Sequence, residues 1–87
     1  MSKPFPCILV TPEKAVFEGE VSYANVPAHD GQEGILTHHA PLLAQLGTGT
    51  LTLTLPDNSK KAWQLEGGFA QMNENRLTLL SENATEA

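Results

Sequence analysis

Positive charge is scarce in this sequence. Its 87 residues carry five Lys and Arg side chains against ten Asp and Glu, which gives a formal net charge of −5. Five cations cannot neutralise a useful run of phosphates, so the composition argues against a nucleic-acid-binding protein. A mild acidic excess is compatible with docking onto basic protein surfaces.

Cysteine and long apolar runs are almost absent as well. A single cysteine, Cys7, leaves no disulfide framework, which predicts an intracellular protein. The N-terminal segment MSKPFPCILV holds an apolar run of only four residues, too short for a signal peptide or a membrane span. We therefore expect that any work at a membrane is done by holding on to another protein.

Motifs for catalysis and for nucleotide or metal binding are missing too. Neither G-x-x-x-x-G-K-[ST] nor G-x-G-x-x-G occurs, so we expect no binding or hydrolysis of ATP, and the carboxylates are scattered over predicted turns. His29, His38 and His39 lack metal-ligand spacing, and neighbours on a strand point to opposite faces. Cys7 lies in an apolar stretch, which predicts a buried, inert thiol. The sequence thus predicts no catalytic, cofactor-binding or metal-binding residue.

Short apolar stretches separated by turn residues fill the chain, a pattern typical of an all-β sandwich or barrel. The clearest is TLTLTL at 50–55, with leucines on one face and threonines on the other. We predict one domain, 1–87, whose fold is an all-β, small antiparallel β-sandwich of eight to ten locally connected strands. The polar tail 82–87 is expected to fray. The predicted strands are 5–10, 15–17, 21–26, 35–37, 42–46, 50–55, 61–65, 69–72 and 76–80.

The stretch PAHDGQEG at 27–34 is predicted to be a loop with a tight turn at Asp30-Gly31. It is either a solvated connection or a recognition loop carried on a rigid scaffold, which is where β-sandwiches usually place function. The residues alone indicate a small β-sandwich interaction module and go no further.

Five short motifs occur along the chain in a fixed order: Phe17-Glu18-Gly19, Gly31 to Leu36 (G-x-x-G-I-L), His39 to Leu43 (H-x-P-L-L), Gly67-Gly68-Phe69 and Asn75 to Ala84. Their order and spacing resemble the N-terminal β-sandwich domain of the epsilon subunit of F-type ATP synthase, from residue 7 to about residue 84. His38 stands where the family usually has glycine, and histidine is among the residues that best tolerate a positive φ there. The family commonly continues into a helical hairpin that brakes hydrolysis, whereas this sequence ends at Ala87.

The resemblance implies a non-catalytic rotor-stalk subunit that docks on the gamma subunit and the c-ring and couples ion-driven rotation to ATP synthesis. It implies a peripheral position on the cytoplasmic face of the bacterial inner membrane, with no cofactor, no direct membrane insertion and no required homo-oligomer. The alternative is a generic β-sandwich module that binds a protein or a ligand. The implied c-ring contact loop is His29, Asp30, Gly31, Gln32 and Glu33, and the implied gamma contact is His39, Leu42, Ala44 and Gln45.

Overall fold

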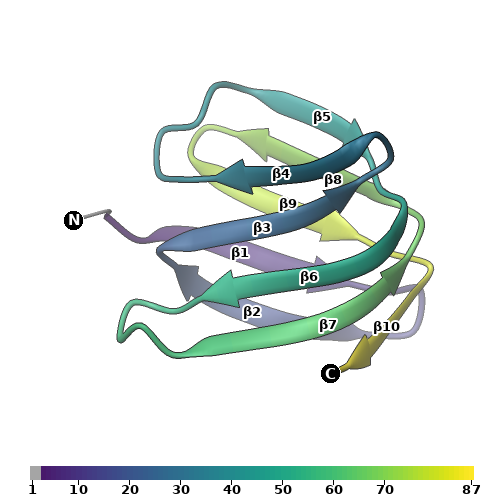
Figure 1. Cartoon of the computed structure of the whole chain (residues 1–87). Helices are drawn as coiled ribbons and strands as arrows, with labels where there is room; N and C mark the ends of the chain where they lie inside the picture. The colour runs from purple at the N-terminus through teal and green to yellow at the C-terminus, as the bar shows by residue number, and fades with distance from the viewer. Residues whose placement is uncertain (1–2) are drawn as a thin grey trace.

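Two five-stranded β-sheets lie face to face (Figure 1). The computed structural model describes residues 3–87, so the first two residues of the predicted domain lie outside the described part. Sheet I has the strand order β2-β1-β9-β8-β5, and sheet II has the order β10-β7-β6-β3-β4. The all-β sandwich prediction is confirmed. The strands are β1 (Phe5–Val10), β2 (Ala15–Val21), β3 (Tyr23–Ala28), β4 (Gly31–Ile35), β5 (Leu42–Gln45), β6 (Thr48–Thr54), β7 (Lys60–Glu66), β8 (Phe69–Asn73), β9 (Arg76–Leu80) and β10 (Asn83–Glu86).

The core fills the space between the sheets and follows the two-residue alternation of the strands. Leu51 and Leu53 of β6 are fully buried, as the leucine–threonine alternation predicts, whereas Leu55 lies beyond the strand end and is half-buried. Both sheets contribute to a single cluster, which accounts for the stability of so short a chain. Its members are Phe5, Cys7, Leu9, Val21, Ala24, Val26, Ile35, Leu46, Leu51, Leu53, Trp63, Leu65, Ala70, Met72, Leu77 and Leu79.

The pairing of β1 with β9 is parallel, with Ile8 opposite Thr78 and Val10 opposite Leu80. The prediction of an antiparallel sandwich of locally connected strands is therefore wrong for β1 and β9. It is also wrong for β5, which pairs with β8 rather than with a strand next to it in the chain. No local turn signals these contacts, because a parallel pair needs a long crossover connection. Together the two pairings bring the chain's beginning, middle and end into one sheet.

The hairpin of β3 and β4 replaces the loop predicted at 27–34 and the strand predicted at 35–37. β3 continues through Pro27, and β4 returns at once after a turn at His29 and Asp30. Pro27 fits in this strand because the pairing of β3 with β6 stops at Asn25, so no ladder hydrogen bond from residue 27 to β6 is lost. Gly31 begins β4 with φ +138°, a backbone conformation that side chains rarely adopt.

The C-terminal tail pairs with sheet II instead of fraying. β10 lies antiparallel to β7, with Ala84 opposite Leu65, and the Ala87 amide donates to the Ala62 carbonyl at 2.9 Å. Ser81, a buried polar residue, starts this segment, and its hydroxyl lies 2.8 Å from the Asn83 carbonyl oxygen. The expectation of a frayed tail was based on composition, which does not register an available sheet edge.

Gly67 and Gly68 carry the chain from sheet II to sheet I. Gly68 has φ +111°, and a Cβ at this position would collide with the Leu80 carbonyl oxygen. The absence of a side chain therefore lets the start of β8 lie against the end of β9. As a result Phe69 sits directly opposite Leu80 on the outer face of sheet I.

Cys7 provides a test of the core. Burial raises the pKa of its thiol from 9.0 to about 12. The folded state therefore keeps the thiol proton above pH 9.0, where the unfolded chain releases it, so this group's contribution to the free energy of unfolding falls as pH rises from 9.0 towards about 12.

We expect the native thiol to resist alkylation at neutral pH, as measured by mass spectrometry, and urea unfolding to show a steeper loss of stability above pH 9.0 than in the Cys7→Ala variant. Rapid labelling of the folded protein, or identical pH dependence in the two proteins, would show that Cys7 is not shielded in solution.

Candidate docking surfaces

The implied c-ring contact residues lie on the β3–β4 hairpin. His29 and Asp30 are exposed at its turn, Gly31 and Gln32 are exposed on β4, and Glu33 is half-buried. The His29 amide donates to the Gln45 carbonyl at 2.7 Å, which ties the turn to the end of β5. The structure therefore groups these five residues on a hairpin whose backbone is hydrogen-bonded on both strands, not on a free loop.

The histidine pair lies on the turn between β4 and β5, outside any strand, so the predicted strand geometry does not apply to it. His38 has φ +62°, which confirms that this position takes a positive φ. Its amide donates to the Asn75 Oδ1 atom at 2.6 Å, and the His39 amide donates to the Leu36 carbonyl at 3.1 Å. Asn75 thus holds the turn from the neighbouring β8–β9 hairpin.

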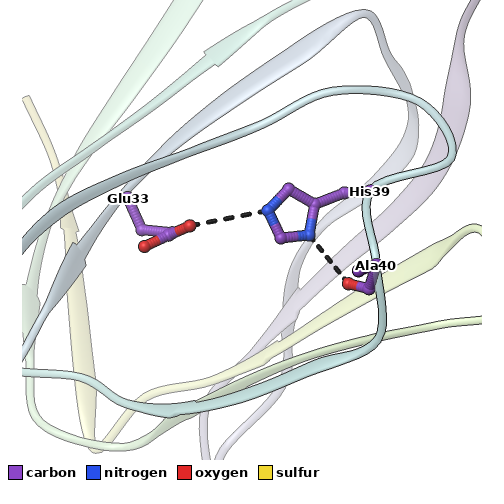
Figure 2. A network of polar contacts seen from close by, with 3 residues as sticks. All are labelled: Glu33, His39 and Ala40. Atoms are coloured by element: carbon purple, nitrogen blue, oxygen red, sulfur yellow. Dashed lines mark hydrogen bonds and ion pairs between the residues drawn. The ribbon is translucent and has the colours of Figure 1, made fainter.

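The ring of His39 contacts β4 (Figure 2). Its Nε2 atom lies 3.5 Å from a carboxylate oxygen of Glu33, and its Nδ1 atom lies 2.8 Å from the carbonyl oxygen of Ala40. One implied gamma-contact residue therefore touches one implied c-ring-contact residue. The two implied sites are adjacent in space, which the sequence does not reveal.

A surface hollow of about 380 Å³ also joins the two implied sites. It lies where β4 and β5, one edge strand from each sheet, face each other. Gly31, Gln32 and His39 lie outside it. The lining comes from the hairpin and from β5: Ala28, His29, Asp30, Glu33, Leu42, Leu43, Ala44 and Gln45.

The outer face of sheet I carries an apolar surface that the sequence analysis missed. Leu43 is 71% exposed, and Phe69 and Leu80 are each 55% exposed. Strand register places Val10, Leu80 and Phe69 in one row across β1, β9 and β8. We call Ile8, Val10, Leu43, Phe69 and Leu80 the apolar face.

The signal for this face was present in the alternation of β8 and β9. Ala70 and Met72 are core residues, and this alternation directs Phe69 outward. The sequence analysis named Phe69 only as part of a family motif and did not identify it as an exposed side chain. A second hollow, of about 270 Å³, continues the face from Phe69 and Leu80 towards Thr11 and Pro12.

The outer face of sheet II has the opposite character. β6 presents Thr48, Thr50, Thr52 and Thr54 to the outside, and the Thr50 hydroxyl donates to Gln64 Oε1 at 3.1 Å. We call the outer side chains of β6 the threonine face. Because these side chains are polar, most of the exposed large apolar side chains on the strands of residues 3–87 lie on sheet I, with Tyr23 of β3 the exception at 37% exposed.

The described residues show no assembled catalytic or metal centre. Cys7 is buried with a raised pKa, which is the opposite of what a nucleophilic thiol requires. Within residues 3–87, no three His, Cys, Asp or Glu side chains gather as a possible metal site. No helix in the same range has the length and apolar character to cross a membrane.

The structure is that of a two-sheet β-sandwich domain, with large apolar side chains exposed on the outer face of sheet I and an adjoining hairpin that bears Asp30 and Glu33. The family described as "ATP synthase, Delta/Epsilon chain, beta-sandwich domain" matches residues 4–87. The chain belongs to this ATP synthase family, which confirms the resemblance found in its motifs.

Two relatives illustrate two lengths within the family. The ATP synthase epsilon chain of Chlorobium limicola is 42% identical over 83 residues, which cover 95% of this chain and 94% of the relative. The ATP synthase epsilon chain of Dichelobacter nodosus is 37% identical over 87 residues, covering 100% of this chain but 61% of the relative. This chain therefore spans nearly the whole of some relatives and about three fifths of others.

Solved structures share the fold. A chain in the Euglena gracilis mitochondrial ATP synthase, in a structure of OSCP, F1 and c-ring, superposes with a TM-score of 0.90 at 20% identity. This chain is covered to 95% and the Euglena chain to 53%. A chain in the central stalk and c-ring of the Tetrahymena thermophila enzyme gives 0.78 at 16% identity, covering 95% and 66% of the two chains.

Proposed function

We propose that this chain is a non-catalytic rotor-stalk subunit of an F-type ATP synthase. It docks on the gamma subunit through the apolar face and β5, and on the c-ring through the β3–β4 hairpin. In this position it couples ion-driven rotation of the ring to ATP synthesis. As an ATP synthase subunit it is part of a membrane-associated complex, and we place it on the cytoplasmic face of the bacterial inner membrane.

The apolar face is the observation that carries the proposal. Leu43, Phe69 and Leu80 are large apolar side chains exposed to water on the same face of sheet I, and groups of this kind mark protein contacts on soluble domains. Gln45, an implied gamma contact, lies beside Phe69 in the register of β5 and β8 and so adjoins the apolar face. Leu42 and Ala44 alternate to the other side of β5, where Leu42 packs against the core. A stable subunit contact needs about 1,000 Å² of buried surface in total, more than β5 offers alone.

The β3–β4 hairpin supplies the second contact. Asp30 and Glu33 give its exposed end a negative charge, which suits basic polar loops on the ring. Partly exposed pairs of this kind contribute at most about 1 kcal/mol each, so they orient the subunit more than they hold it. A close-packed sandwich between the two contacts transmits strain with little compliance, which is what mechanical coupling requires.

Gamma binding is tested with Leu43→Asp and Phe69→Asp, which place a charge on the apolar face without touching the core. Each should weaken binding to gamma by roughly 1–3 kcal/mol, because the carboxylate would be buried at the contact. Thr50→Asp on the threonine face is the matched control and should bind normally. Affinity is measured by calorimetry, with a thermal melt of each variant to verify folding. Normal gamma binding by both folded apolar-face variants would refute this docking face.

Ring docking is tested by cross-linking. A cysteine at Gln32, which is exposed on β4, should cross-link to c-subunit loops in the assembled enzyme. The native Cys7 is buried and should not compete for the reagent. Thr50→Cys serves as the control and should give no product with c. Products that join residue 32 only to subunits of the catalytic head would contradict the assignment.

A further inference from the structure

The contact between Glu33 and His39 links the two docking surfaces. Glu33 belongs to the hairpin proposed to face the ring, and His39 belongs to the turn that leads into β5. The distance between Nε2 of His39 and Oε2 of Glu33 is 3.5 Å (Figure 2), which is the length of an ion pair rather than of a close hydrogen bond. Within the described chain, this is the one ion pair that the structure contains.

Both nitrogens of the His39 ring face oxygen acceptors. Nδ1 lies 2.8 Å from the Ala40 carbonyl oxygen, which has no proton to give, so Nδ1 must carry the hydrogen of this bond. Nε2 then faces the Glu33 carboxylate, and the two side chains form an ion pair when the ring is protonated. The ring is thereby oriented from both ends, and the Glu33 carboxylate has a fixed partner.

Hydrogen bonds also attach the β4–β5 turn, which carries His39, to sheet I. The Asn75 Oδ1 atom accepts a hydrogen bond from the His38 amide at 2.6 Å. It also accepts one from the Thr37 hydroxyl at 3.4 Å. Asn75 follows β8 and precedes β9, the strands that bear Phe69 and Leu80. Contacts therefore lead from the ring-facing hairpin to the β8–β9 turn, and the two strands run from that turn to Phe69 and Leu80 at their far ends.

We propose that the Glu33–His39 contact couples the two docking surfaces, so that binding of one partner strengthens binding of the other. This proposal rests on the proposed function. His39 is a positioning residue in this scheme: it holds the Glu33 carboxylate in the direction in which the hairpin meets the ring, and it holds the turn in the position that β5 needs to meet gamma.

The partial exposure of the Glu33 and His39 side chains explains why their contact becomes stronger only when a partner binds. The side chains of His39 and Glu33 are 27% and 41% exposed, so water screens their attraction in the free chain. A partner that covers either surface excludes water from the pair and lowers the effective dielectric, which strengthens the attraction. Because such coupling is reciprocal, gamma must favour ring docking by the same factor as the ring favours gamma docking.

The test measures the affinity of the chain for purified gamma with and without detergent-solubilised c-ring. The wild-type chain should bind gamma at least about five-fold more tightly when the ring is present, at the lower end of typical coupling. Glu33→Gln and His39→Ala should lose most of this enhancement. His39→Gln should retain part of it, because its amide can still donate towards Glu33 from nearly the same position as Nε2.

Glu66→Gln is the matched control. It removes one exposed carboxylate from β7 of sheet II, outside both proposed docking surfaces and away from His39, so it should keep the enhancement. Direct contacts between gamma and the ring are identical for every variant, so the differences among variants report the chain alone. An enhancement that is absent in the wild type, or that survives in Glu33→Gln and His39→Ala, overturns the coupling but leaves the proposed function standing. A wild-type chain that binds neither gamma nor the ring overturns both.

Discussion

Sheet I packs apolar side chains into the core and also exposes several on its outer face, among polar ones such as Glu18 and Gln71, and the functional account depends on this property. Its inner face fills the core with residues such as Leu9, Leu77 and Leu79, as any sandwich requires. Its outer face exposes Leu43, Phe69 and Leu80, which do not add to the core. Burying a large apolar side chain completely is worth roughly 1.5–3 kcal/mol, so covering these half-exposed groups supplies several kcal/mol to a partner contact. The threonine face of sheet II exposes no comparable apolar area that a partner could cover.

The connections between the sheets place the polar groups next to this apolar face. The chain leaves sheet II after β4 and enters sheet I at β5 through the turn that holds His38 and His39. A positive φ at His38 and its bond to Asn75 set the shape of that turn, and His39 then reaches back to Glu33. One crossover therefore brings an acidic hairpin, a histidine contact and an apolar strand together. The proposal that one small domain contacts two partners rests on this proximity.

Local sequence patterns predicted the strands whose alternation is regular. β1 and β9 were predicted with their observed bounds, and the leucines of β6 face the core as predicted. The errors fall where the outcome depends on distant partners. Composition led to the prediction of a loop at 27–34, but a turn at His29-Asp30 and pairing with β3 make the second half of this segment into β4. The tail became β10 only because β7 offered an open edge.

The candidate site was less predictable than the fold. Family motifs identified the hairpin and β5, but spacing along the chain gave no sign that Glu33 touches His39 or that both segments line one hollow. Phe69 was overlooked because an aromatic residue in a short chain is usually assigned to the core. Its outward direction follows from the burial of its neighbour Ala70, which requires knowing how β8 and β9 are registered.

Side-chain footprinting of the assembled ATP synthase tests the central claim most directly. Hydroxyl-radical labelling, read by mass spectrometry, compares the isolated chain with the same chain in the complex. The account predicts that labelling of Leu43 and Phe69 falls strongly on assembly, while labelling of Tyr23, which is 37% exposed on sheet II, changes little. Unchanged labelling of Leu43 and Phe69, or protection confined to Tyr23, would contradict the assignment of the apolar outer face of sheet I as the docking surface.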